Sequence, residues 1–264
     1  MGTEDSSAVL QLADELGAIV VATDWRGLEA DDRIEAIEVA GDFGRFPVIT
    51  DRLVQAHVNQ RTLLALVQEG SLLEHTFFTG DSGQQLGDPD TVVYYGISLG
   101  GIEGQVFMAQ DPGVEAAVLH VPGGFWSTML ERSTQWPLFE LVMEDTVPSP
   151  HDRQLLYAIS QLFWDPVDPV SWTGELGAQT ILMQEAIGDE QVPNMTTEAL
   201  ARSIGLPLLS PEVRLPYGLE LASELAVGSS ALVQFDPMVG EPEDINRPPS
   251  LSGAHSDILS LIHI

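Results

Sequence analysis

Residues 91–101 read Thr-Val-Val-Tyr-Tyr-Gly-Ile-Ser-Leu-Gly-Gly and join an apolar run to a serine that lies between glycines. The β-branched and aromatic side chains of 91–95 predict a strand that is buried on both faces, and the apolar residues of 99–110 recur at helical spacing. Glycines on either side of Ser98 remove side chains where the tight turn between strand and helix crowds its own backbone. We therefore expect the hydroxyl of Ser98 to be exposed at a helix N-terminus, as a nucleophile requires.

The pentapeptide Gly96-Ile97-Ser98-Leu99-Gly100, between a strand and a helix, resembles the nucleophile elbow of the α/β-hydrolase superfamily. This resemblance implies an α/β fold: a mostly parallel sheet with helices on both faces, and a helical cap inserted after the strand that follows the nucleophile helix. It also implies that the backbone N–H of Leu99 is one donor of the oxyanion hole. The alternative is a turn serine without chemistry.

The composition limits the classes of partner. Forty acidic residues stand against ten basic ones, all arginine, and the formal charge is −30, so nucleic acid and anionic membranes are poor partners. Without cysteine there is no disulfide, no thiolate metal site and no cysteine nucleophile. No apolar stretch has the length of a membrane span, and the first residues lack the pattern of a signal peptide. The compartment, cytoplasmic or secreted, stays open.

The length favours one large domain. With 264 residues, of which 44% are hydrophobic, the chain can bury one sizeable core. We expect one incomplete α/β-hydrolase domain over 1–258, with its body formed by 1–124 and 178–258 and its cap by about 125–177. The last six residues, 259–264, match the translation of a sequencing adaptor, so we leave them out of the fold.

The residues before the elbow predict two helices and a strand. The first helix ends at Gly17, and the continuous apolar run 18–23 predicts an interior parallel strand. The acidic stretch 28–49 is predicted to be irregular, and a second helix is predicted from Thr50 to Glu69. His57, inside that helix, has no second histidine or cysteine at the spacing of a metal pair, so we interpret it as a partly buried helix residue.

In the resembling superfamily, three further strands precede a helix and strand at these positions. The second donor of the oxyanion hole would then lie at or before Gly2, in a loop that follows the third of those strands. We therefore expect the sequence to be part of a longer protein and its own turnover to be weak or absent.

Aromatic residues and methionines dominate the cap segment. Before it, residues 116–121 predict the next strand, and we interpret His120 as a packing residue within that strand. The resemblance places the cap over the site, where an apolar lining would accept an acyl chain. We name Phe125, Trp126 and Met129 as candidate substrate-binding residues. The alternative is that these side chains pack the cap onto the body.

A candidate acid follows the next predicted strand, 179–185, in the turn Gly188-Asp189-Glu190-Gln191-Val192-Pro193. This turn resembles the D-x-x-V-P acid turn of the superfamily. The resemblance makes Asp189 the carboxylate that orients a histidine and stabilises its imidazolium. Glu190 and Glu185 are the alternative acids, and capping of the following helix is the alternative role for Asp189.

A candidate base follows the last predicted strand, 230–236. His255 is the only histidine between that strand and the adaptor-like tail, and the order Ser98, Asp189, His255 is the order of the triad in the superfamily. The resemblance makes His255 the general base and implies a closing helix after it, which we expect to be missing. The alternative is an exposed histidine near the end of the chain.

Together these residues predict a serine hydrolase that cleaves carboxylic esters with an apolar acyl or alcohol group through an acyl-enzyme on Ser98. No motif for an organic cofactor or a metal occurs, so we expect neither, and the expected partner is a small ester or lipid-like substrate. An acyltransferase, a thioesterase or an amidase could use the same residues. Epoxide and haloalkane hydrolysis are disfavoured, since those members of the superfamily have aspartate at the position of Ser98. A catalytically silent binding or scaffold protein is the alternative from another class, and the oligomeric state stays open.

Overall fold

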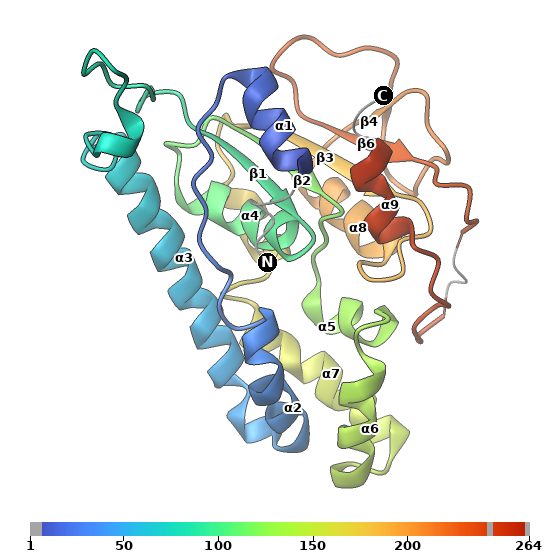
Figure 1. Cartoon of the computed structure of the whole chain (residues 1–264). Helices are drawn as coiled ribbons and strands as arrows, with labels where there is room; N and C mark the ends of the chain where they lie inside the picture. Colours follow the sequence, from blue (N-terminus) through green and yellow to red (C-terminus); the bar gives the residue numbers. More distant parts are fainter. Residues whose placement is uncertain (1–6, 242–244, 262–264) are drawn as a thin grey trace.

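In the part of the chain that the structure describes, six parallel strands form one sheet, which lies in the upper part of the molecule as drawn in Figure 1. The computed structural model describes residues 7–241 and 245–261. Within them the strand order is β1-β2-β3-β6-β4-β5, and every ladder is parallel. The strands are β1 (Val93–Ile97), β2 (Ala116–His120), β3 (Thr180–Ala186), β4 (Leu208–Leu209), β5 (Leu221–Ala222) and β6 (Ala231–Phe235). The mostly parallel sheet predicted from the sequence is confirmed.

Helices connect and cover the strands. They are α1 (Ser7–Leu16), α2 (Arg33–Gly41), α3 (Pro47–Gln68), α4 (Leu99–Gln110), α5 (Trp126–Met129), α6 (Pro137–Thr146), α7 (Pro150–Trp164), α8 (Asn194–Ile204) and α9 (Ala254–Leu261). Positive φ angles at Gly17, Gly70 and Gly205 follow the ends of α1, α3 and α8, because glycine adopts this conformation without steric cost. The predicted helix 99–110 is confirmed with the same bounds.

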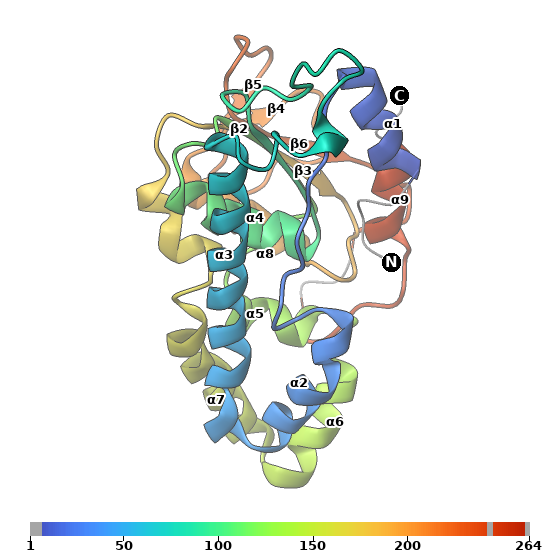
Figure 2. The ribbon, with the colours of Figure 1, turned by 60° about the vertical axis from the view of Figure 1, so that its left-hand side comes forward.

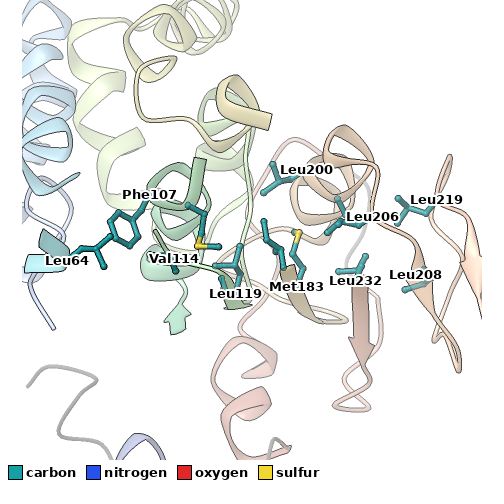
Figure 3. Close-up of a cluster of buried hydrophobic side chains, with 14 residues drawn as sticks. Leu64, Phe107, Val114, Leu119, Met183, Leu200, Leu206, Leu208, Leu219 and Leu232 are labelled. Carbon is teal, nitrogen blue, oxygen red and sulfur yellow. The ribbon is translucent and has the colours of Figure 1, made fainter. Parts of the chain in front are cut away.

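The main hydrophobic core lies between the sheet and the helices α4 and α8. Alternate strand residues face this core, and Leu119, Met183 and Leu232 form its row along the sheet (Figure 3). Phe107 of α4 and Leu200 of α8 close it from the helix side. Because successive side chains of a strand point to opposite faces, the other residues of these strands lie on the opposite face of the sheet.

That opposite face is covered less completely. Ala254 and Ile258 of α9 pack against Ile97 and Phe235, so helices lie on both faces of the sheet as predicted. However, Val93 remains 61% exposed. The prediction that the strand before Ser98 is buried on both faces is therefore wrong, since β1 forms an edge of the described sheet and pairs with β2 alone.

A helical lobe made of α2, α5, α6, α7 and the first half of α3 lies below the sheet in Figures 1 and 2. Its interior contains Phe46, Leu53 and Trp164, which pack together with Trp126. The prediction that 28–49 is irregular is wrong, because α2 lies there and buries apolar side chains such as Val39 against its neighbours. A role for residues 125–177 as a cap stays a prediction.

The predicted strand 18–23 is also wrong. Among the described residues no strand pairs with this segment, and Ile19, Val20 and Val21 are 39 to 44% exposed. A strand needs a neighbouring edge for its N–H and C=O groups, which apolar side chains cannot replace.

The end of the chain differs from its prediction as well. We expected no helix after His255 and left residues 259–264 out of the fold. Instead α9 begins at Ala254 and extends to Leu261, so it includes the first residues of that tail, while 262–264 lie outside the described residues. Burial of Ala254 and Ile258 against the sheet explains why this helix forms.

Candidate active site

Ser98 lies in a sharp turn between β1 and α4. Its φ and ψ angles are 55° and −118°, a conformation that costs free energy for any residue with a Cβ. The turn needs its glycines, because a Cβ at Gly96 would collide with the carbonyl of Gly100, and a Cβ at Gly101 would lie 2.5 Å from the carbonyl oxygen of His120. The N–H of Ser98 donates to the same His120 carbonyl at 3.0 Å, which fixes the turn to the end of β2.

The hydroxyl of Ser98 lies at the N-terminus of α4. Leu99 is the first residue of this helix, so its N–H has no acceptor within the helix. An oxyanion that forms beside Ser98 would meet this N–H and the positive end of the helix dipole. The second predicted donor, at or before Gly2, lies outside the described residues.

Asp189 lies in the loop after β3, with a side chain that is 2% exposed. Its Oδ1 accepts hydrogen bonds from the N–H groups of Gln191 and Val192, at 2.8 and 2.9 Å. Gly188 has a φ of 85°, and a Cβ there would lie 2.5 Å from the carbonyl oxygen of Gly240. The loop therefore turns around the carboxylate and holds it in one orientation.

His255, the second residue of α9, lies between Asp189 and Ser98. Its Nε2 is 2.9 Å from the Oγ of Ser98, and its Nδ1 is 2.8 and 3.0 Å from the two carboxylate oxygens of Asp189. Because a carboxylate only accepts, the ring proton belongs on Nδ1, and Nε2 is free to accept from the hydroxyl. His255 is 7% exposed, so the alternative of an exposed histidine is wrong. The fold thus brings together side chains that lie 157 and 66 positions apart in the chain.

Neither alternative acid contacts the His255 ring. The Glu190 carboxylate accepts from the Ser252 hydroxyl at 2.6 Å and from the backbone N–H of His255 at 3.4 Å. Burial of Glu190 opposes its ionisation, but these hydrogen bonds outweigh burial and lower the pKa of Glu190. Glu185 accepts from Gln234 at 3.0 Å, and burial raises the pKa of Glu185 to about 8.

The three predicted substrate-binding residues lie in and just before the short helix α5: Phe125 precedes it, Trp126 begins it and Met129 ends it. Trp126 stacks on Trp164 with 4.9 Å between ring centroids, and Met129 is buried in the same cluster. Phe125 is half-buried and has a φ of 58°. Packing within the helical lobe accounts for Trp126 and Met129 without a ligand, so the substrate-binding role of all three residues stays a prediction.

Sequence reasoning missed Asp168, which fixes the segment after β2. Its buried carboxylate accepts from the N–H groups of Phe125 and Trp126, at 2.9 and 2.7 Å, and from the side chain of Gln161 at 2.8 Å. The available signal was the dipeptide Asp168-Pro169, because an aspartate before proline is a common start of a helical turn.

A second buried histidine and carboxylate also escaped the sequence analysis. His57 of α3 and Glu103 of α4 are 3% and 0% exposed, and His57 Nε2 lies 2.8 Å from Glu103 Oε2. Burial raises the pKa of Glu103, and the hydrogen bond from His57 works against this rise. Within the described part of the chain, His57 Nδ1 has no hydrogen-bond partner. Sequence analysis predicted partial burial of His57 but gave no sign of its partner, 46 positions away.

Neither a metal cluster nor a membrane-spanning helix occurs among the described residues. No group of three or more histidine, cysteine, aspartate or glutamate side chains there could hold a metal ion. In the same residues, no helix has the length and apolar character that crossing a membrane requires.

Comparison with known proteins gave a distant structural likeness. The chain matches no protein-family model and no curated protein. Among solved structures it is similar to the uncomplexed acylaminoacyl peptidase of Pyrococcus horikoshii, with a TM-score of 0.36 and 14% sequence identity. The similarity covers 67% of this chain and 24% of that chain, so the chain spans about a quarter of that protein's length.

Proposed function

We propose that Ser98, His255 and Asp189 are the catalytic triad of a serine hydrolase that cleaves carboxylic esters. The observation that supports this most is the continuous hydrogen-bonded path from Ser98 Oγ to His255 Nε2, at 2.9 Å, and from His255 Nδ1 to Asp189, at 2.8 Å. A nucleophile, a base and a group that orients the base are the parts that acyl transfer requires. The strained elbow and the free N–H at the start of α4 support the same proposal.

The first half of the reaction forms an acyl-enzyme. Ser98 Oγ attacks the ester carbonyl carbon while its proton passes to His255 Nε2. Asp189 stabilises the imidazolium, and the Leu99 N–H donates to the oxygen that becomes negative. His255 then gives the proton to the departing alcohol, and the carbon–oxygen bond of the ester breaks.

The second half releases the acid. A water molecule attacks the acyl carbon as His255 Nε2 takes its proton, and the same proton returns to Ser98 Oγ when the acyl bond breaks. No net proton remains on His255 at the end of the cycle. The chain's own residues thus return to their starting state.

The substrate class rests on the composition of the segment that we expect to cover the triad as a cap. Segment 125–177, which follows β2, is rich in apolar and aromatic side chains, and this favours an apolar acyl or alcohol group over a charged one. Hydrolysis of thioesters or amides and acyl transfer require the same three residues. Comparing the rates on these substrates distinguishes the reactions.

Hydrolysis of p-nitrophenyl esters of increasing acyl length tests the proposal on the 264-residue chain. We expect kcat/KM to rise with acyl length and to be lost in Ser98→Ala. Ser203→Ala, which removes an exposed hydroxyl of α8, is the matched control and should match the wild type. Hydrolysis that persists in Ser98→Ala would contradict the triad. Faster cleavage of amides than of esters would contradict the ester assignment alone.

A further inference from the structure

We infer that Glu190 is a positioning residue for His255. Together with Ser252 it holds the first turn of α9 so that the imidazole stays between Ser98 and Asp189, and its negative charge stabilises the imidazolium that forms during acyl transfer. This inference rests on the proposed function, and it gives Glu190 a role different from that of the acid at the ring.

The backbone of His255 needs such support. The described residues between β6 and α9 form no helix or strand, and Gly253 immediately before α9 has a φ of 84°. The ring of His255 is held by Asp189, but the ring contact does not fix the main chain that carries it. A shift of about 1 Å at a catalytic group can cost roughly a hundredfold in rate, so the start of α9 must be held closely.

Glu190 and Ser252 supply this support through one carboxylate oxygen. Glu190 Oε2 accepts from the Ser252 hydroxyl at 2.6 Å and from the His255 N–H at 3.4 Å. The Ser252 proton could also reach the Gly188 carbonyl, at 2.8 Å, but a carboxylate is the stronger acceptor. Ser252 Oγ in turn accepts from the N–H of Ala254 at 3.2 Å. Glu190 therefore holds the N–H of His255 directly and the N–H of Ala254 through Ser252.

The charge of Glu190 acts on the same histidine. Its lowered pKa keeps the carboxylate ionised at neutral pH, beside the positive end of a helix. Titratable groups on the neighbouring elements include Asp189 in the loop after β3, Asp257 on α9 and His120 at the end of β2. Burial lowers the pKa of His120 to about 4, so this residue is uncharged at neutral pH. Two neighbouring carboxylates thus contact one histidine, Asp189 at its ring and Glu190 at its backbone.

Three variants separate the charge of Glu190 from its hydrogen bonds. Glu190→Gln removes the charge and keeps an acceptor, whereas Glu190→Ala and Ser252→Ala remove the contact itself. Glu198→Gln is the matched control, because it removes one charge from a carboxylate of α8 that pairs with Arg214, and α8 lies across the sheet from α9. The readouts are the pKa of His255 by NMR titration, hydrogen exchange at the His255 amide, and the pH profile of ester hydrolysis.

We expect Glu190→Gln to lower the pKa of His255 by about half a unit or more, because a nearby negative charge favours the imidazolium. The acid limb of kcat/KM should move to lower pH by the same amount, and Glu198→Gln should move neither. Glu190→Ala and Ser252→Ala should speed exchange at the His255 amide and lower kcat about tenfold with KM within about twofold.

The inference is overturned if Glu190→Gln leaves the pKa of His255 at the wild-type value, or if Glu190→Ala leaves exchange at its amide unchanged. Both readouts are independent of turnover. If the wild type neither cleaves an ester nor reacts with a fluorophosphonate at Ser98, the proposed function fails, and the NMR titration and hydrogen exchange still decide the role of Glu190. If esters are cleaved and Glu190→Gln behaves like Glu198→Gln, only the inference about Glu190 fails.

Discussion

Two buried pairs of histidine and carboxylate lie in different regions of this molecule, and both have a nitrogen to oxygen distance of 2.8 Å. One pair, His255 and Asp189, joins α9 to the loop after β3. The other, His57 and Glu103, joins α3 to α4. Both histidines are almost fully covered, so burial and pairing alone do not distinguish them.

The second ring nitrogen distinguishes the two pairs. In His255 it lies 2.9 Å from the hydroxyl of Ser98, whereas in His57 it has no hydrogen-bond partner among the described residues. The His57 ring instead packs against Trp25 in a T-shaped arrangement, with 5.0 Å between ring centroids. A buried histidine paired with a carboxylate can therefore act as a base only where its second ring nitrogen reaches a nucleophile. Where it does not, as at His57, the pair links two helices.

Removal of each histidine should give the largest difference between the pairs. We expect His255→Ala to lower kcat/KM for ester hydrolysis by roughly a thousandfold or more, because it removes the base. His57→Ala should leave kcat/KM of the folded protein within about fivefold of the wild type, since the ring contacts Glu103 and Trp25 and its hydrogen bond is not with a triad residue. An equal loss of kcat/KM in both variants would contradict the different roles of His255 and His57.

Replacement of the carboxylate at the first pair should give the next largest effect. Asp189→Asn keeps the shape of the side chain but offers a donor to Nδ1, so it favours the wrong tautomer of His255. We expect kcat to fall by roughly 10²-fold to 10⁴-fold, measured on the ester that the wild type cleaves best. Asp165→Asn, at the end of α7, is the control and should leave kcat unchanged. A normal kcat in Asp189→Asn would show that the ring needs no carboxylate.

Loss of the carboxylate from the pair His57 and Glu103 should lower the stability of the fold. Glu103→Ala leaves His57 buried without its partner, and we expect the free energy of unfolding in urea to fall by about 3 to 5 kcal/mol. Glu103→Gln keeps an acceptor for His57 and should lose less. The contrast between the regions disappears if Asp189→Asn destabilises the fold more than Glu103→Ala does.

A third buried carboxylate, Glu185, is hydrogen-bonded to Gln234 and not to a histidine, and its replacement should change the free energy of unfolding least. Its pKa is about 8 in the folded chain against an ordinary value of 4.5, so between these pH values the folded state binds more protons than the unfolded state. The contribution of Glu185 to stability therefore falls as pH rises through this window. Relative to the wild type, Glu185→Gln should gain about 1 to 3 kcal/mol of unfolding free energy between pH 5 and pH 8. A gain at pH 5 that equals the gain at pH 8 would contradict the raised pKa.

Local signals in the sequence predicted the central part of the fold. Apolar runs mark β2, β3 and β6, glycines follow the helices α1, α3 and α8, and the elbow at Ser98 has its own glycine pattern. Each of these features depends on neighbouring residues. The places of Ser98 after β1 and of Asp189 after β3 could therefore be predicted from neighbouring residues. The choice of His255 came from the order of residues in the resembling superfamily, and the helix α9 that carries this histidine was not predicted.

Features that depend on distant partners could not be predicted. The run 18–23 has the side chains of a strand, but no neighbouring strand in the described residues pairs with it. In the stretch 28–49, the many acidic residues made the buried apolar side chains of α2 hard to recognise. The partner of His57 lies on another helix, and the donors to Asp168 lie about forty positions away. No single window of sequence contains both members of such a contact.

Labelling by a fluorophosphonate probe, with the labelled residue located by mass spectrometry, tests the central claim most directly. We predict that the probe modifies Ser98 in the wild type and in His57→Ala, and that modification is strongly slowed in His255→Ala. Modification at another serine, or equal rates in the two histidine variants, would contradict the claim that His255 activates Ser98.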